Sequence, residues 1–239
     1  MYDSSRELHS EHFKDHFMTN CAILPAAGLA SRMRGLPKFM LPCSDDYETL
    51  LERHVINLLP LVDKIWIPTR PEYANLILRL GFDAKVIIQV METRNMSETV
   101  IEVASAARAD NFLLCMPDTY FHGELPYETL SKTSEILNLA LFKIRNDQKG
   151  KLGQILLSDQ GSVIGSVDKD VNCDYELAWG AMSFNNDFVK LLDPDEPHVG
   201  YAIPRCIDKF KVKGSVLNSE YFDCGTPSEY LKLLKTIWT

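Results

Sequence analysis

The chain has 239 residues, 46% of them hydrophobic, which is enough to build the core of one large α/β domain. Its net charge of −8 argues against nucleic acid as a partner, because nucleic-acid-binding proteins usually carry a basic surface. No apolar run approaches the roughly 20 residues that span a bilayer, and the first residues lack the apolar core of a signal peptide. We therefore expect a cytoplasmic protein with no membrane partner.

The cysteines and the N-terminal residues suggest a compartment and a domain boundary. The six cysteines are scattered without a Cys-x-x-Cys pair, which favours reduced, mostly buried thiols over disulfides or zinc. Residues 1–17 carry histidines at helical spacing, so both a metal-binding helix and a frayed amphipathic tail are open readings. We expect the tail, disordered, ahead of a single domain over residues 18–239.

Up to residue 116, short apolar runs alternate with segments whose apolar residues recur every three or four positions. In chain order the pattern predicts strand 21–24, helix 46–59, strand 63–67, helix 72–80, strand 84–89, helix 97–108 and strand 111–116. This alternation predicts βαβ units, and hence a mainly parallel sheet with helices on both faces.

The second half of the chain has a different pattern. It predicts strands in 136–144 and 152–168, the latter folded by a turn at Asp159-Gln160-Gly161, then strand 177–184, helices 185–192 and 198–209, strand 212–217 and helix 227–237. The expected fold is therefore α/β: a Rossmann-like, doubly wound, mixed but mainly parallel sheet with a small, more antiparallel lobe.

One segment, residues 21–42, joins an apolar strand to a loop of small side chains and then to Arg32, Arg34 and Lys38. Backbone this bare can bring its N–H groups against phosphate oxygens or a base edge. Arginine can bind two oxygens at once, and lysine adds a compact charge. The segment predicts a site for a small anionic ligand, with a tight strand-to-helix turn and solvated basic residues as the alternative.

Two aspartates follow two predicted strands. Asp118 ends the apolar run 111–116, and Asp223 ends a shorter run before Gly225-Thr226-Pro227. Strand ends of an open α/β sheet meet at one crevice, so both carboxylates could bind one Mg²⁺, whose other positions go to phosphates and water. Alternatively, Asp118 caps the following turn and Asp223 caps the last helix.

Three segments resemble those of a known family. PAAGLASRMRGLPK resembles the signature loop of nucleotidylyltransferases with the glycosyltransferase-A-like fold. LLCMPDTYF resembles the metal-aspartate strand of the sugar-1-phosphate nucleotidylyltransferases, and YFDCGTPSEYL resembles their closing Asp-x-Gly-Thr-Pro segment. The first motif is also similar to methylerythritol-phosphate and molybdopterin cytidylyltransferases, whereas the Gly-Thr-Pro ending favours sugar phosphates.

This resemblance implies roles for individual residues. The nucleotide would be held by the loop residues Ala26, Ala27, Gly28, Leu29, Ala30 and Ser31, with Gln89 as a candidate base reader. Arg32 would grip the triphosphate, and Lys38 would lie at the reacting α-phosphate. Asp118 and Asp223 would ligate the catalytic Mg²⁺. Lys169 falls where the family carries a Glu-Lys pair, and would bind the sugar phosphate.

The chain departs from the family pattern in the signature loop and in a sugar-contacting segment. Ala30 stands where the signature loop usually has glycine, and Ala178-Trp179-Gly180 replaces a segment that usually begins with asparagine. Trp179 could stack on an apolar sugar face or belong to the core. Trp179 and Gly180 are therefore candidate substrate-binding residues, together with Glu176, which could reach a sugar hydroxyl.

The expected activity is Mg²⁺-dependent transfer of a nucleoside monophosphate from a nucleoside triphosphate to a sugar-1-phosphate, which gives a nucleotide sugar and pyrophosphate. A cytidylyltransferase acting on an alcohol phosphate is the alternative enzyme, and a non-catalytic nucleotide-sugar-binding domain is the alternative outside catalysis. A homodimer is a candidate assembly.

Overall fold

The computed structural model describes residues 18–28, 33–46, 48–132 and 135–238. The expected tail over residues 1–17 therefore lies outside the described residues. Among those described, no helix combines the length and the apolar character needed to cross a membrane.

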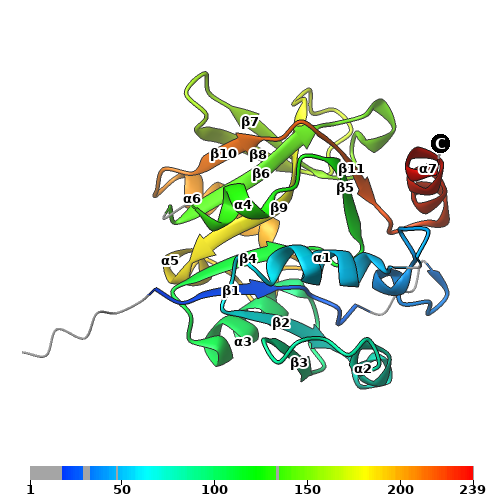
Figure 1. Cartoon of the computed structure of the whole chain (residues 1–239). Coiled ribbons are helices and arrows are strands. Elements are labelled where there is room, and N and C mark those ends of the chain that lie inside the picture. The colour runs from blue at the N-terminus through cyan, green and yellow to red at the C-terminus, as the bar shows by residue number, and fades with distance from the viewer. Residues whose placement is uncertain (1–17, 29–32, 47, 133–134, 239) are drawn as a thin grey trace, which may run out of the picture.

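Among the described residues, a nine-stranded sheet runs through the molecule (Figure 1). Its main order is β10 (Lys213–Val216), β6 (Leu137–Lys143), β9 (Leu177–Asn185), β4 (Asn111–Cys115), β1 (Asn20–Ile23), β2 (Lys64–Thr69) and β3 (Val86–Val90). In addition, β7 (Gly153–Leu157) pairs with β9, and β8 (Val163–Asp168) pairs with β7. Four strands from the first half are mutually parallel: β1 (Asn20–Ile23), β2 (Lys64–Thr69), β3 (Val86–Val90) and β4 (Asn111–Cys115). The helices α1 (Leu50–Leu58), α2 (Pro71–Leu78) and α3 (Met96–Ala107) connect them. The expected βαβ arrangement is confirmed.

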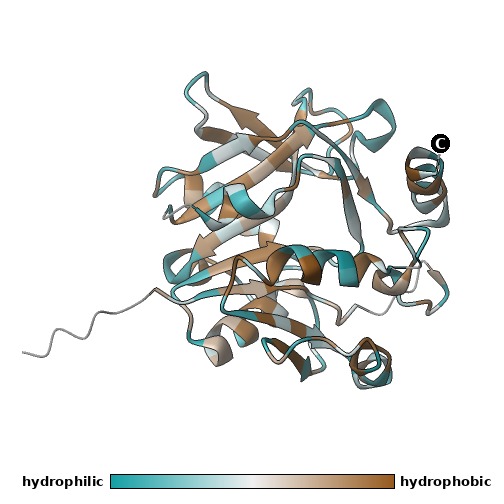
Figure 2. Cartoon of the chain, viewed as in Figure 1, coloured by the Kyte–Doolittle hydropathy of each residue, from teal (hydrophilic) through white to brown (hydrophobic). Residues whose placement is uncertain are grey.

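Helices cover both faces of this sheet because successive strand side chains point in opposite directions. On β1, Ala22 packs in one core cluster with residues of α1 and α2, whereas Cys21 and Ile23 pack in another cluster with residues of α3. Figure 2 shows the apolar residues concentrated along the strands and the inner faces of the helices. The predicted doubly wound α/β class is therefore correct.

The start of α1 is set by its cap. Thr49 accepts a hydrogen bond from the Glu52 N–H, and the Glu52 carboxylate accepts one from the Thr49 N–H, which together form a capping box. The helix consequently begins at Leu50, later than the start at residue 46 that the apolar spacing predicted.

The second half forms a lobe with more antiparallel pairing. β9 (Leu177–Asn185) is antiparallel to β4, β6 (Leu137–Lys143) and β7 (Gly153–Leu157), and β7 is antiparallel to β8 (Val163–Asp168). β10 (Lys213–Val216) is parallel to β6, and a bridge between Ser162 and Lys213 joins it to the start of β8. The expected antiparallel lobe is confirmed.

Several elements differ from the prediction. β5 (Thr119–Gly123) and β11 (Ser219–Asp223) form a separate two-stranded antiparallel sheet, and α4 (Tyr127–Ser131) follows β5. The expected helix 185–192 is only one turn, α5 (Asn186–Val189), and 198–209 divides into η4 (Val199–Tyr201) and α6 (Ala202–Ile207). The closing helix α7 (Pro227–Ile237) is as expected. The short strand before Gly225 was expected, whereas β5 and α4 were missed, and each of these two is five residues long, too short to show a period.

Candidate functional site

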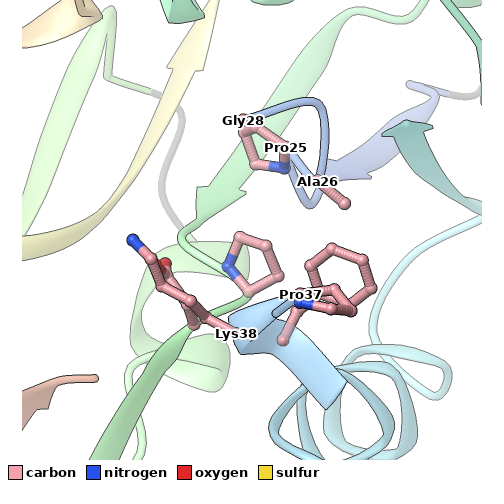
Figure 3. Close-up of a pocket in the computed structure, with 8 residues that line it drawn as sticks. Pro25, Ala26, Gly28, Pro37 and Lys38 are labelled. Carbon is pink, nitrogen blue, oxygen red and sulfur yellow. The ribbon is translucent and has the colours of Figure 1, made fainter. Parts of the chain in front are cut away.

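The loops after β1 and β4 open on the same pocket, as the ends of parallel strands in an open sheet should. The pocket is lined by Pro25, Ala26, Gly28, Pro37, Lys38, Phe39, Pro117 and Asp118. Figure 3 shows the loop residues Pro25 to Gly28 on one side of it and Pro37 and Lys38 on the other. Two of the predicted segments, far apart in sequence, therefore meet here.

Lys38 reaches this pocket from η2 (Lys38–Met40), a short 3-10 helix that follows Pro37. Its neighbour Phe39 is buried against Tyr73 of α2, which anchors the turn. The Lys38 Nζ lies 3.3 Å from Asp118 Oδ2, and the side chains are 13% and 26% exposed. The ammonium and the carboxylate are therefore partly shielded but still accessible to a ligand.

Asp223 is brought beside Asp118 by the small β5–β11 sheet. Asp223 pairs with Thr119 in that sheet, and the next residue, Cys224, donates its N–H to the Asp118 carbonyl oxygen at 3.0 Å. Burial raises the pKa of the Cys224 thiol, and the Asp118 and Asp223 carboxylates raise this pKa further. Both carboxylates thus lie close enough to act on one thiol, which stays protonated and is no nucleophile.

The alternative that Asp223 caps the last helix is wrong. The N-cap of α7 is Thr226, whose hydroxyl accepts from the Glu229 N–H, while Asp223 Oδ1 accepts from the Gly225 N–H at 3.0 Å. The Asp223 carboxylate therefore stabilises the turn ahead of the helix. It lines the pocket that also contains Lys169, described below.

A buried histidine that the sequence analysis did not identify holds the Asp118 turn. His54 of α1 is 1% exposed, with Nε2 3.0 Å from the Thr119 carbonyl oxygen and Nδ1 3.0 Å from the Tyr127 hydroxyl. The carbonyl can only accept, so Nε2 carries the proton and Nδ1 accepts from the tyrosine. Burial lowers the pKa of His54 to about 4, so the ring is neutral at pH 7.

A larger pocket of about 320 Å³ continues from the Asp118 corner toward α3. Its lining comprises Pro25, Ala27, Gly28, Arg70, Thr93, Arg94, Asn95, Met96, Thr99, Met116, Pro117 and Asp118. Asn95 is the N-cap of α3, and its side chain accepts from the Glu98 N–H at 2.9 Å. Polar loop residues and two methionines thus give this pocket both hydrogen-bonding and apolar surface.

A further pocket of about 340 Å³ lies on the other side of Asp223 and contains Lys169. It is lined by Gln148, Gly150, Lys151, Leu152, Lys169, Asp223, Gly225, Thr226 and Glu229. Lys169 has a φ of 51°, in the left-handed region that is unusual for a lysine. The structure therefore places Lys169 and Asp223 in the lining of one pocket.

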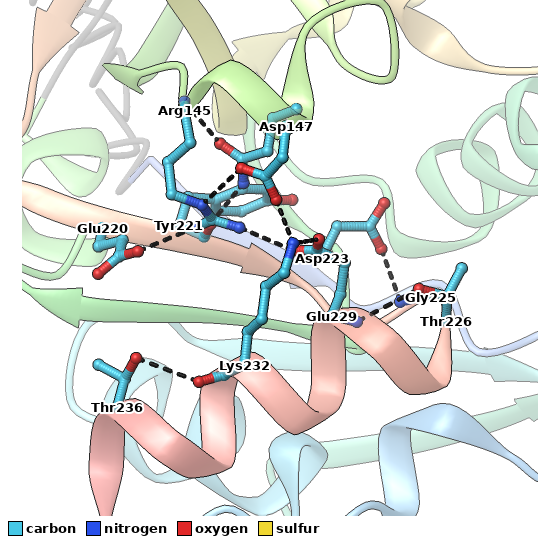
Figure 4. A network of polar contacts seen from close by, with 11 residues as sticks. Arg145, Asp147, Glu220, Tyr221, Asp223, Gly225, Thr226, Glu229, Lys232 and Thr236 are labelled. Atoms are coloured by element: carbon cyan, nitrogen blue, oxygen red, sulfur yellow. Dashed lines mark hydrogen bonds and ion pairs between the residues drawn. The ribbon is translucent and has the colours of Figure 1, made fainter. Parts of the chain in front are cut away.

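An ion-pair network fastens the Asp223 strand and α7 to the antiparallel lobe (Figure 4). Arg145 donates from Nη1 to the Tyr221 carbonyl oxygen at 2.8 Å and from Nη2 to Glu229 at 2.7 Å. Lys232 pairs with Asp147 and with Glu229. The network therefore connects η3 (Asn146–Gln148) and its preceding arginine with both ends of the Asp223 loop.

Trp179 and Gly180 lie at a β-bulge in β9, where the register against β6 jumps from Ala181 to Trp179. A side chain on Gly180 would collide with Tyr221, Phe121 and Phe142. Trp179 packs against the opposite core, close to Gly153 and Gly200. Gly180 thus belongs to the core, and the bulge directs the Trp179 indole to the face of the sheet that α3 covers.

Besides Trp179 and Gly180, two further predicted residues are not brought to these pockets. Glu176 lines a separate groove formed by residues 155–157 and 174–177. Gln89 lies on the edge strand β3, and its Oε1 is buried without a hydrogen-bond partner among the described residues. Leu29, Ala30, Ser31 and Arg32 lie outside the described residues, so their predicted roles stay predictions.

The donor set suits a magnesium ion. Asp118 and Asp223 supply hard oxygen ligands from two adjoining backbone segments, and Mg²⁺ typically takes one or two carboxylates together with substrate phosphates and water. The described residues contain no group of three or more His, Cys, Asp or Glu that could hold a metal, so Asp118 and Asp223 would hold this ion only together with a phosphate ligand.

Comparisons with known proteins agree with this geometry. Residues 22–137 match a family model described as the MobA-like NTP transferase domain. No curated protein sequence matches the chain.

Solved structures share the fold at low sequence identity. A Bacillus anthracis protein described as a glucose-1-phosphate thymidylyltransferase has a TM-score of 0.80 at 14% identity, over 92% of this chain and 95% of that one. UDP-glucose pyrophosphorylase from Acinetobacter baumannii has a TM-score of 0.71 at 19% identity, over 91% of this chain and 92% of that one. The inositol-1-phosphate CTP transferase from T. maritima has a TM-score of 0.72 at 16% identity, over 92% of this chain and 96% of that one.

The family match covers the loop after β1, Lys38 and Asp118, and the structural likeness extends over the lobe that carries Lys169 and Asp223. The expected resemblance is thereby confirmed: residues 22–137 match the MobA-like NTP transferase domain, which supports an enzyme of the nucleotidyltransferase type, and the chain shares the fold of the solved nucleotidyltransferases.

Proposed function

We propose that the protein transfers a nucleoside monophosphate from a nucleoside triphosphate to a sugar-1-phosphate, releasing pyrophosphate. The observation that carries the proposal is that Lys38 pairs with Asp118, which lines the pocket toward α3, while a backbone hydrogen bond joins Asp118 to the segment of Asp223, which lines the pocket around Lys169. The pocket toward α3 would take the nucleotide, and the pocket around Lys169 would take the acceptor phosphate. Asp118 and Asp223 stand where the two would meet.

In the proposed reaction an acceptor phosphate oxygen attacks the α-phosphorus, and the bond from that phosphorus to the pyrophosphate oxygen breaks. A phosphate monoester is already largely deprotonated at neutral pH, its second pKa being about 6, so no general base is required. The main barrier is alignment of two polyanions that repel each other. Lys38 would neutralise charge at the α-phosphate, and Lys169 would hold the acceptor phosphate.

Mg²⁺ is part of the same proposal. Bound by Asp118 and Asp223, it would neutralise charge on the phosphates and on the departing pyrophosphate. The Lys38 ammonium already lies against Asp118, so the lysine and the aspartate would orient the same phosphate group. Arg32, if it acts as the family resemblance implies, would hold the triphosphate tail.

A cytidylyltransferase that acts on an alcohol phosphate is the second candidate. The fold is shared with an inositol-1-phosphate CTP transferase, at a TM-score of 0.72. The acceptor in that case would still present a phosphate monoester, so Lys169 and the two aspartates would act in the same way, and only the region beyond the phosphate would differ.

The test is pyrophosphate release from CTP, UTP, dTTP, GTP and ATP, each combined with a panel of sugar-1-phosphates and alcohol phosphates, with Mg²⁺. Asp118→Ala serves as the inactive variant and His122→Asn as the matched control, because His122 is exposed on β5 in a different groove. Release with a sugar-1-phosphate that is lost only in Asp118→Ala supports the proposal. Release with alcohol phosphates alone selects the second candidate. If no pair releases pyrophosphate, the remaining hypothesis is a domain that binds nucleotide without turnover.

Two further features belong to this proposal. A cytoplasmic location is supported by the six cysteines, all of which are free thiols, since disulfides are common in oxidising compartments. A homodimer is the assembly we would test by light scattering at several protein concentrations.

A further inference from the structure

Residues 193–198 contact the wall of the pocket that lies toward α3. The Asn95 Nδ2 donates to the Pro194 carbonyl oxygen at 2.7 Å, and the Met96 N–H donates to the Pro197 carbonyl oxygen at 3.2 Å. Asn95 and Met96 both line that pocket, on the side where the nucleotide would bind. One end of this segment is therefore fixed to the proposed donor side of the site.

The other end of the segment is His198, which contacts the acceptor side. Its Nδ1 accepts from the Gly200 N–H at 3.2 Å, so the proton of the neutral ring is on Nε2. Nε2 lies 3.2 Å from Asp168 Oδ2 and therefore donates to this carboxylate. The two side chains are 14% and 20% exposed, so the contact is shielded from water, which strengthens it.

Asp168 immediately precedes Lys169, whose backbone is held in the left-handed region at a φ of 51°. A non-glycine residue in that region is strained, so the surrounding contacts must hold it there. The Lys169 N–H donates to the Leu152 carbonyl oxygen at 3.2 Å, and the Asp168 side chain is held by His198. These two contacts fix the corner from which Lys169 faces its pocket.

An ion pair also fixes residues 193–198 to α6. Both carboxylate oxygens of Glu196 accept from the Arg205 guanidinium at 2.6 Å, and Arg205 also donates to the Leu191 carbonyl oxygen at 2.9 Å. Two parallel bonds of this kind fix orientation as well as distance. His198 is thus held on a short, tied segment.

We propose that His198 is a positioning residue that acts through Asp168 to place Lys169 for the acceptor phosphate. This inference rests on the proposed function, because Lys169 is given the acceptor there. His198 itself touches no substrate. Its effect is on acceptor binding, because the backbone turn that it holds presents Lys169 to the acceptor pocket and is not part of the nucleotide pocket.

Two substitutions separate the contacts of His198, and a third serves as the control. In His198→Asn the amide oxygen can still accept from Gly200, but the side chain is too short to reach Asp168. In His198→Gln the amide nitrogen can occupy the place of Nε2 and restore the donor. His122→Asn is the matched control on an exposed histidine. These three variants and the wild type are compared in steady-state kinetics with the best substrate pair from the screen.

We expect His198→Asn to raise KM for the acceptor about tenfold, the effect of one hydrogen bond to a charged group, and to leave KM for the nucleotide within about twofold. His198→Gln should recover most of the loss. In an Asp168→Ala background, which has no acceptor for Nε2, His198→Asn should add nothing, because the contact is already lost. Equal changes in both KM values, or additive effects of the two substitutions, would overturn the proposal.

A binding measurement independent of turnover uses inorganic phosphate, followed by the rise in melting temperature with phosphate concentration. Lys169→Met gives the background from phosphate bound elsewhere. Above this background, His198→Asn should need about ten times more phosphate than the wild type for the same rise. No wild-type rise above the Lys169→Met background, or an unchanged response in His198→Asn, defeats the inference. The expected phosphate pattern without pyrophosphate release from any pair defeats the proposed function alone.

Discussion

Lys38 and Asp118 come from segments 80 residues apart in the sequence and lie 3.3 Å apart in the structure, as an ammonium and a carboxylate at the mouth of one pocket. Each partly neutralises the other, so neither is a lone buried charge. A ligand that brings both a metal ion and a phosphate could separate the pair without leaving either group unpaired. The contact thus describes a site ready for such a ligand.

Lys38→Met should reduce kcat/KM by about 10³, because it removes a fixed positive charge from the place where charge develops during transfer. The fold should be little affected, since the lysine is at a pocket edge. Lys211→Met, on an exposed lysine after α6, is the control and should be as active as the wild type. Steady-state kinetics and a melting curve for both variants check this. A Lys38→Met protein with normal kcat/KM contradicts the role given to Lys38.

Metal dependence is the second prediction. Removal of divalent cations should abolish pyrophosphate release, and Mg²⁺ should restore it, because the two aspartates would need a cation to approach the phosphates. Asp223→Asn should raise the Mg²⁺ concentration needed for half-maximal activity about tenfold, since one charged ligand is lost. His122→Asn should keep the wild-type value. Full activity in the presence of a chelator would remove Mg²⁺ from the mechanism.

His54 predicts how stability depends on pH. Its folded pKa of about 4 lies below the unfolded value of 6.5, so the unfolded chain binds the proton more readily. The contribution of neutral His54 is therefore complete above about pH 6.5 and is lost as the pH falls toward 4. It amounts to something on the order of 3 kcal/mol. Chemical denaturation at pH 7 and pH 4.5 measures the difference.

His54→Gln offers the comparison for this pH effect. Glutamine can still donate to the Thr119 carbonyl oxygen but does not titrate, so the variant should be less stable at pH 7 and lose less stability on acidification. If the wild type and His54→Gln lose the same stability between pH 7 and pH 4.5, another group causes the acid sensitivity.

The sequence predicted the parallel half of the sheet well because each of its strands is a short apolar run between amphipathic helices. It also placed Asp118 and Asp223 at strand ends, since Pro117 and Gly225 mark where the strands stop. The small β5–β11 sheet was missed because its pairing joins residues about 100 positions apart, which no local period records. That same sheet is what brings the two aspartates together.

The supporting residues could not be found in the sequence for a similar reason. His54 lies on the buried face of α1 and was read only as part of the helical spacing. His198 and Asp168 meet through the segment that follows β9, and no motif joins them. Gly180 was given to the substrate from its place in the family pattern, whereas the bulge turns it toward Tyr221.

Gly180→Ala provides a direct test of the bulge. The added methyl group would lie 2.7 Å from Tyr221 Cε2 and 3.0 Å from Phe121 Cζ, so the buried rings must move. We expect a loss of about 2 kcal/mol, or a melting temperature lower by about 5 °C. Gly28→Ala is the matched control for stability, because nothing lies within 4 Å of its added methyl group. Equal melting temperatures for the two variants would contradict this packing.

Arg145→Met should lower both stability and turnover, because the guanidinium ties Tyr221, two residues before Asp223, to Glu229 of α7. The Glu229 side chain is 12% exposed and would keep only Lys232 as an ion-pair partner among the described residues, so a cost of about 2 kcal/mol is expected. Since Asp223 would be held less firmly, kcat should fall while KM for the nucleotide stays near the wild-type value. Arg79→Met, on an exposed arginine after α2, should change neither quantity. A stable but inactive Arg145→Met protein would instead mean that this arginine contacts the substrate. A less stable protein with full kcat would mean that the network supports the fold without positioning Asp223.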